Sequence, residues 1–210
     1  DAVLDKLWRK GAVLGRKLLV RSNRKELCAQ GDCLPGVESC PNGAVRKLNP
    51  DRTVSEECRV IWDLRNANAD GHVLNHPPAL TPRHRELARA ILWWIQRLPG
   101  IPVYLFKLDV TGAFTLVWLR PLDVGKVATE VGAEAWGLKP GEELTALSLV
   151  IEFGGCGSPG EWIPWNWGLK SVHSRTRPDV PRWNGAECFS SSFLVDDQSF
   201  YEPLVGVRPW

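Results

Sequence analysis

The sequence predicts an α+β fold in which an antiparallel sheet carries helices packed on one face. Short apolar runs bounded by turn residues indicate strands at several places along the chain, and two segments carry the start signals of helices. Strands and helices in separate runs are typical of the α+β class. With 210 residues, of which 44% are hydrophobic and 24% charged, the chain is long enough to bury a sizeable core.

The composition also excludes several classes of protein. No apolar run reaches the ~18 residues that a membrane-spanning helix needs, and no segment has the pattern of a secretory signal. We therefore expect an intracellular protein, in the cytoplasm or nucleus, that has no membrane partner and is not secreted. Because the chain starts at Asp1 and contains no Met, we also expect it to be a fragment of a longer protein.

The first 25 residues are strongly basic, although the formal net charge of the chain is only +2. They carry eight lysines and arginines against Asp1 and Asp5. A basic end of this kind can contact nucleic-acid phosphates, and it can equally be a solvated helix or strand face. The charge alone leaves both interpretations open.

A turn-rich loop over 28–43 leads into a predicted β-hairpin. Residues 44–48 and 58–64 are strand-like runs, and Asn49-Pro50-Asp51 between them is a turn sequence. Three basic side chains give the hairpin a cationic face: Lys47, Arg52 and Arg59.

Residues 83–98 are predicted to form a helix. Pro82 stands at its first turn, and Pro99-Gly100 ends it. The apolar side chains recur at helical spacing and form one stripe, made by Leu87, Ile91, Trp94 and Leu98. We interpret this stripe as the face that packs on the core.

The second half of the chain contains further strand-like runs at 103–108, 144–153 and 189–195, and a further apolar run at 115–119. Residues 122–142 are predicted to be a helix or an excursion from the sheet. Ser158-Pro159-Gly160-Glu161 is a capping box, which predicts that a helix starts there. Pro164 falls within its first turns and predicts a kink or a short helix.

Three carboxylates directly follow predicted strands. Asp109 ends the run 103–108, and Asp196 and Asp197 follow the run 189–195. Asp is unfavourable inside strands, so each of these residues is either a turn residue or a ligand. Clustered carboxylates are the ligands that Mg²⁺ prefers. Two such ions about 3.5–4 Å apart can activate an attacking hydroxyl and stabilise a leaving phosphate.

The six cysteines suggest a different function. A chain with this much core does not need disulfides, and nothing marks it for export, so we expect most of the thiols to be free. Cys28 and Cys33 together with His72 and His76 offer four zinc ligands, although no C-x-x-C pair is present. A zinc-stabilised interaction domain therefore remains an alternative.

Four segments resemble the motifs of one enzyme family, and they occur in the family's order. They are Arg59–Asn68 with the pattern R-x-x-x-D-x-R-x-x-N, Val103–Phe114 (VYLFKLDVTGAF), Phe153–Trp162 (FGGCGSPGEW) and Phe193–Asp197 (FLVDD). These segments are similar to the fingers segment and to motifs A, B and C of reverse transcriptases, with the nearest resemblance to those of eukaryotic retrotransposons. Leu194 stands where motif C usually has Tyr, and Trp162 replaces the Phe of motif B.

The resemblance implies an RNA-directed DNA polymerase built from a polymerase palm and a fingers hairpin, with the thumb absent. It implies fingers at 1–82 and a palm at 83–121 and 143–210, with 122–142 an unassigned excursion. The implied partners are an RNA or DNA template with its primer, and dNTPs. The implied cofactor is Mg²⁺, as two ions for which Mn²⁺ can substitute. The thumb and an RNase H domain are expected elsewhere in the polyprotein.

The resemblance also implies roles for individual residues. Catalysis and metal binding are assigned to Asp109, Asp196 and Asp197, with the backbone carbonyl of Val110 as a further metal ligand. Binding of the dNTP is assigned to Lys47, Arg59, Val110, Phe114 and Gly154. The two cations suit the anionic triphosphate, and the ring of Phe114 would act as a steric gate against a 2′-hydroxyl. Glycine at 154 lets the backbone approach the nucleotide closely.

A catalytically decayed palm that still binds nucleic acid is a further alternative. Leu194 and the missing thumb favour this interpretation. The intact set of Asp109, Asp196, Asp197 and Arg59 favours an active enzyme, since decay has no reason to spare all four.

Overall fold

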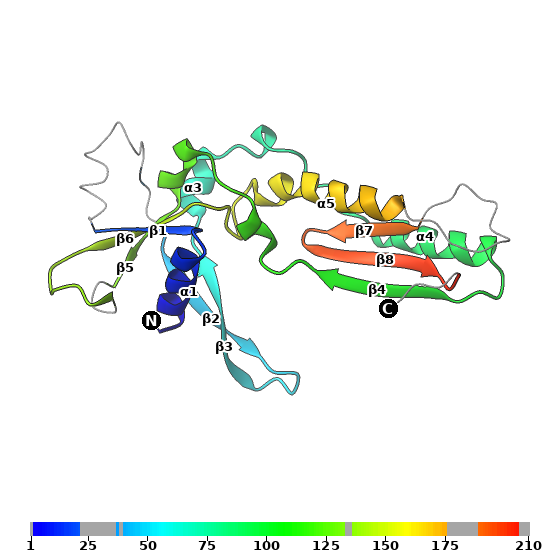
Figure 1. Ribbon diagram of the computed structural model, residues 1–210, viewed down its shortest axis with the longest axis horizontal. Helices are drawn as coiled ribbons and strands as arrows, with labels where there is room; N and C mark the ends of the chain where they lie inside the picture. Colours follow the sequence, from blue (N-terminus) through cyan, green and yellow to red (C-terminus); the bar gives the residue numbers. More distant parts are fainter. Residues whose placement is uncertain (1, 22–36, 38–39, 133–135, 176–188, 206–210) are drawn as a thin grey trace. The chain divides into compact units, whose positions relative to one another are not determined.

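The computed structural model describes residues 2–21, 37, 40–132, 136–175 and 189–205 (Figure 1). It is a mixed α/β structure with antiparallel sheets and several helices, which agrees with the predicted α+β class. The chain divides into two compact units. Unit 1 comprises Asp1–His76 and Phe114–Ser158, and unit 2 comprises Pro77–Ala113 and Pro159–Trp210.

Residues 143–158 belong to unit 1 together with the predicted excursion 122–142. Strand pairing accounts for this grouping. The excursion supplies strand β5 (Ala128–Val131), which pairs with β6 (Leu144–Ser148), and β6 in turn pairs with β1 (Lys17–Val20).

Unit 1 is built around this three-stranded antiparallel sheet of order β1-β6-β5. Every residue of β6, the central strand, is buried. Helix α1 (Ala2–Val13) precedes β1, and the 3-10 helix η3 (Pro121–Lys126) precedes β5. One core cluster of the unit contains the buried side chains of Val37, Val124, Ala128 and Leu147.

The predicted basic hairpin is present in unit 1. Strand β2 (Asn42–Leu48) pairs with β3 (Val54–Trp62) in antiparallel register, and an irregularity lies between Arg46 and Leu48. The second strand starts earlier than the sequence indicated. A short helix α3 (Arg65–Asp70) and a 3-10 turn η1 (Val73–Asn75) follow the hairpin.

Unit 2 contains a three-stranded antiparallel sheet of order β4-β8-β7 and two helices. Its strands are β4 (Val103–Asp109), β7 (Ser190–Leu194) and β8 (Asp197–Pro203). Helix α4 (His84–Arg97) matches the predicted helix 83–98, and its Trp94 is fully buried in a cluster with Phe189 and Tyr201. The apolar stripe therefore packs on the core, as predicted.

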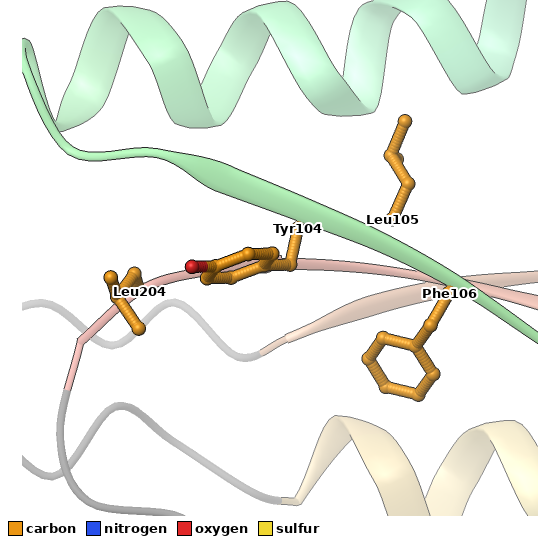
Figure 2. A pocket seen from close by; sticks show the side chains of 4 residues that line it. All are labelled: Tyr104, Leu105, Phe106 and Leu204. Atoms are coloured by element: carbon orange, nitrogen blue, oxygen red, sulfur yellow. The ribbon is translucent and has the colours of Figure 1, made fainter.

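The two helices of unit 2 lie on opposite faces of the sheet, not on one face as predicted. Tyr201, which pairs with Leu105, packs with α4. Phe200, which pairs with Phe106, contacts His173 of α5 (Ser158–Ser174). Successive strand residues point to opposite faces, and Figure 2 shows Leu105 directed toward α4 and Phe106 directed the other way.

Helix α5 starts at the predicted capping box but is not a short helix. It continues for 17 residues through Pro164. Packing on both sides of this proline accounts for the length, because Trp162, Ile163 and Asn166 are buried and His173 contacts Glu202 and Phe200 further along. Tertiary burial outweighs the helix-breaking tendency of one proline here.

Two smaller findings complete the description. The apolar run 115–119 is not a strand, since the 3-10 helix η2 (Ala113–Leu116) occupies its start and Trp118 forms only an isolated bridge with Val150. In the part of the chain that the structure describes, no helix combines the length and the apolar character that crossing a membrane requires.

Candidate active site

The carboxylates of the predicted site meet at one end of the sheet of unit 2. Asp109, the last residue of β4, pairs in register with Asp197, the first residue of β8. Asp196 lies in the two-residue turn between β7 and β8, and its carbonyl accepts a 3.4 Å hydrogen bond from the backbone N–H of Val110. Strand register thus brings together residues 88 positions apart in the chain (Figure 1).

The turn that carries Asp196 is strained. Val195 has a φ of 58°, which is rare for a residue with a β-branched side chain. A positive φ at the first central residue is typical of the tight type II′ hairpin turn, which glycine normally supplies. The buried side chain of Asn166 donates a 2.6 Å hydrogen bond from Nδ2 to the carbonyl of Val195, and so holds this turn against α5.

Lys107 forms an ion pair with one of these carboxylates, that of Asp197. Its Nζ lies 2.6 Å from Oδ2 of Asp197. Lys107 and Asp109 are two residues apart on β4, so they share a face with Asp197. The Lys107 side chain is 60% exposed, which makes this a solvated ion pair of modest strength.

The three aspartates offer the type of ligand atom that a hard divalent cation prefers. Asp109, Asp196 and Asp197 offer carboxylate oxygens, which are preferred by Mg²⁺ and Mn²⁺. In the described part of the chain, however, no three metal-ligating side chains converge closely enough to form a ready-made site. With Lys107 paired to Asp197, binding of a cation would require exchange of that ion pair.

We expect replacement of Lys107 with Met to strengthen binding of Mn²⁺ about twofold to fivefold, because it releases Asp197 from an exposed ion pair. Electron paramagnetic resonance of free Mn²⁺ would measure this binding directly. Lys170→Met, at an exposed position on α5, is the matched control and should leave the affinity unchanged. Equal or weaker binding by Lys107→Met would show that Lys107 does not compete with the cation.

The two cations predicted to bind the triphosphate lie on the hairpin of unit 1. Lys47 forms an ion pair with Glu57, whose Oε2 is 2.7 Å from its Nζ. Glu57 and Arg59 are two residues apart on β3 and therefore share a face of the hairpin. Lys47 donates a hydrogen bond to Glu57 and thereby lowers the pKa of that carboxyl, so this face carries an ionised carboxylate together with two cations.

Asp63 and Arg65 lie just beyond the hairpin and form an ion pair with each other. Arg65 donates through Nε and Nη2 to the two oxygens of Asp63, at 2.8 and 2.5 Å. This two-point contact lowers the pKa of Asp63. Both residues therefore serve the local structure.

Phe114 and Gly154 lie in unit 1. Phe114 is buried, and its ring packs against that of Phe153 with centroids 5.5 Å apart. Gly154 has a φ of 104°, a conformation that favours glycine. Asn68 donates from Nδ2 to the Gly154 carbonyl at 3.0 Å. Sequence reasoning missed both Asn68 and Asn166 as site residues, although Asn68 is the last residue of the fingers motif.

The structure accounts for part of the basic N-terminal segment through internal contacts. Arg16 donates to Thr115 Oγ1 at 2.8 Å, Arg21 pairs with Glu142 at 2.7 Å, and Lys17 is buried against Glu152. Arg24 and Lys25 lie outside the described residues. At least four of the segment's cations are thus engaged within unit 1, since Arg9 also lies over the ring of Trp136, 4.3 Å from its centroid.

The zinc alternative rests on residues that the structure describes only in part. Cys28 and Cys33 lie outside the described residues. His72 accepts a hydrogen bond from the backbone of Leu74 at Nδ1, and the ring of His76 lies against Gly157. Cys40, Cys58 and Cys156 are free thiols, in agreement with the sequence interpretation.

A shallow pocket of about 320 Å³ lies along β4, which is an edge strand of its sheet. It is lined by Tyr104, Leu105, Phe106 and Leu204 (Figure 2). None of these side chains carries a charge, so the pocket lacks the groups that would hold a triphosphate or a metal ion.

No protein-family model matches this chain, and no match was found among the curated proteins.

Proposed function

We propose that this chain is the fingers and palm region of a reverse transcriptase, which adds deoxynucleotides to a primer 3′-hydroxyl. The observation that carries the proposal is the register of β4 with β8, which places Asp109 opposite Asp197 with Asp196 in the adjoining turn. This is the arrangement that joins motifs A and C in the family that the sequence resembles.

Two local features support the proposal. The tight turn at Val195 has an energetically unfavourable backbone conformation. Such strain is common at functional sites, where it fixes the direction of a side chain. The three carboxylates are also more exposed than the core of unit 2, so they are open to a ligand. Neither feature is needed for the stability of a simple hairpin.

The residues of the chain would divide the reaction between them. Asp109, Asp196 and Asp197, with the Val110 carbonyl, would hold divalent ions, which when bound lower the pKa of the attacking hydroxyl and neutralise charge on the phosphates. Lys47 and Arg59 would bind the triphosphate and orient it. Contacts to template and primer would be made mainly to their backbones, because a polymerase must accept every sequence.

The test is primer extension on an RNA template with dNTPs and either Mg²⁺ or Mn²⁺, resolved on a gel, with primer-template binding measured separately by fluorescence anisotropy. The proposal expects extension that depends on the template, the divalent ion and the dNTP. Binding without extension would instead support the decayed palm, an alternative that the pairing of Lys107 with Asp197 favours. Absence of both binding and extension would overturn the proposal.

The same assay tests the steric gate. We expect Phe114→Val to lower the preference for dNTPs over rNTPs by up to about 100-fold in kcat/KM, because a smaller side chain leaves room for the 2′-hydroxyl. Phe193→Val removes the same volume from a buried position on β7 and is the control. It should affect both nucleotides equally. Unchanged selectivity in Phe114→Val would assign Phe114 to packing alone.

A further inference from the structure

The side-chain amide of Asn68 is bonded at both ends to one loop. Nδ2 donates to the carbonyl of Gly154 at 3.0 Å, and Oδ1 accepts the backbone N–H of Cys156 at 2.7 Å. Asn68 lies on α3, directly after the basic hairpin, and the loop lies 86 to 88 positions further along the chain. One side chain thus joins two distant segments of unit 1.

The loop, Phe153–Gly157, needs such support because its own backbone bonds are few. Gly155 N–H reaches the Glu152 carbonyl only at 3.4 Å, and Gly154 adopts a φ of 104°. Glycine has the largest conformational freedom of any residue in the unfolded chain, so a glycine-rich loop is costly to order. Two hydrogen bonds from a single amide fix the loop at its centre.

The segment that follows α3, from Gly71 to His76, packs closely against the loop. A Cβ added at Gly71 would come within 2.9 Å of Cys156 Sγ, and one added at Gly157 would collide with the ring of His76. Both segments therefore carry glycine where they touch. This close packing keeps the side-chain amide of Asn68 within hydrogen-bonding distance of the Gly154 carbonyl and the Cys156 backbone N–H.

The loop also carries one residue that the proposed function assigns to nucleotide binding, and it contacts another. Gly154 itself is bonded to Asn68, and Phe153, 69% exposed, packs its ring on Phe114. A change in the position of the Gly154 carbonyl would move Phe153, its direct neighbour, and with it the covering of Phe114.

We propose that Asn68 is a positioning residue that locks the loop 153–157 in the conformation that receives the incoming nucleotide. The two hydrogen bonds of Asn68 support the locking of the loop. The effect on nucleotide binding rests on the proposed polymerase function. Asn68 acts through the loop and is not itself a catalytic residue.

The first experiment measures the loop without any activity. Hydrogen exchange of the Cys156 backbone amide is compared in the full chain for the parent, Asn68→Ala and Asn68→Asp. Asn68→Ala removes the acceptor and should accelerate this exchange about tenfold. Asn68→Asp keeps the acceptor oxygen and should retain most of the protection, although it places an oxygen against the Gly154 carbonyl.

Asn66→Ala is the matched control, because Asn66 is exposed on the same short helix and the substitution changes helix propensity equally. It should leave the exchange of Cys156 unchanged. Equal exchange in the parent and in Asn68→Ala, with both proteins folded by circular dichroism, would overturn the locking of the loop. Acceleration in Asn66→Ala of the same size would overturn it as well.

The second experiment measures incorporation of dTTP on an oligo(dT)-primed poly(rA) template. Asn68→Ala should raise KM for dTTP about tenfold or more while the affinity for primer-template stays within about twofold, since misplacement of a contact group by 1 Å costs up to about 100-fold. A normal KM together with faster exchange would overturn the nucleotide-binding role. If the parent itself incorporates nothing, the proposed function fails, and the exchange data still decide whether Asn68 locks the loop.

Discussion

Replacing Asp109 with Asn is expected to abolish nucleotide addition, with a fall in kcat of about a thousandfold or more. The variant keeps the size of the side chain and removes its charge. A carboxylate that holds a catalytic divalent ion contributes several kcal/mol of charge stabilisation, and each factor of ten in rate corresponds to about 1.4 kcal/mol. Single-nucleotide incorporation by parent and variant, at equal occupancy of primer-template, measures the effect.

The fold should survive this substitution, because Asp109 is exposed at the end of β4 and exposed substitutions usually change stability by about 0.5 kcal/mol or less. Asp123→Asn is the matched control. Asp123 pairs with Arg120 and Lys126 in unit 1, outside the carboxylate cluster. Retention of activity in Asp109→Asn, or an equal loss in Asp123→Asn, would contradict the assignment of Asp109 as a metal ligand.

The largest effect on stability is expected at Lys17, which is buried in unit 1. Its Nζ contacts Oε1 of Glu152, donates to Ser148 Oγ at 2.8 Å, and lies 5.1 and 4.7 Å from the ring centroids of Trp8 and Trp62. Burial lowers the pKa of Lys17 to about 7. At pH 6 the ammonium is charged and compensates the buried carboxylate.

We expect Lys17→Met to lower the free energy of unfolding at pH 6 by about 3–5 kcal/mol, because it leaves the Glu152 carboxylate buried without its partner. The double variant Lys17→Met with Glu152→Gln should recover most of this loss, since no isolated charge then remains. Urea unfolding followed by tryptophan fluorescence measures both. Lys47→Met, which breaks an exposed ion pair, should change stability far less.

The parent should also show a pH dependence that the Lys17→Met variant lacks. The pKa of Lys17 is about 7 in the folded chain and near the ordinary value of 10.5 when unfolded. Between these values the unfolded chain binds more protons, so stability rises as the pH increases from 7 toward 10.5. Equal stability of parent and Lys17→Met at pH 6 would contradict the uncompensated-charge argument.

Local signals in the sequence were sufficient for several elements. The stripe of Leu87, Ile91, Trp94 and Leu98 determined helix α4 and its buried face, because helical periodicity records which side of a helix meets the core. The turn at Asn49-Pro50-Asp51 determined the hairpin. The apolar runs before Asp109 and before Asp196-Asp197 predicted that these residues follow strands, and β4 and β7 confirm this placement.

Other features were decided by contacts between distant segments. Periodicity gives no information about which face of the sheet a helix covers, so the placement of α4 and α5 on opposite faces had to come from the pairing of Leu105 with Tyr201 and of Phe106 with Phe200. Pro164 predicted a kink or a short helix, and burial on either side of it supports a helix of 17 residues.

The amides of Asn68 and Asn166 and the ammonium of Lys107 show the same division at the candidate site. Each of these groups bonds to a partner 29 to 90 positions away, and no spacing rule identifies such a partner in advance. The sequence by itself determined that each carboxylate stands at a strand end or in a turn, because strand ends and turn residues are local properties. Only the tertiary structure decided what holds and neutralises them, because hydrogen bonds and ion pairs of this kind depend on the distances that folding creates.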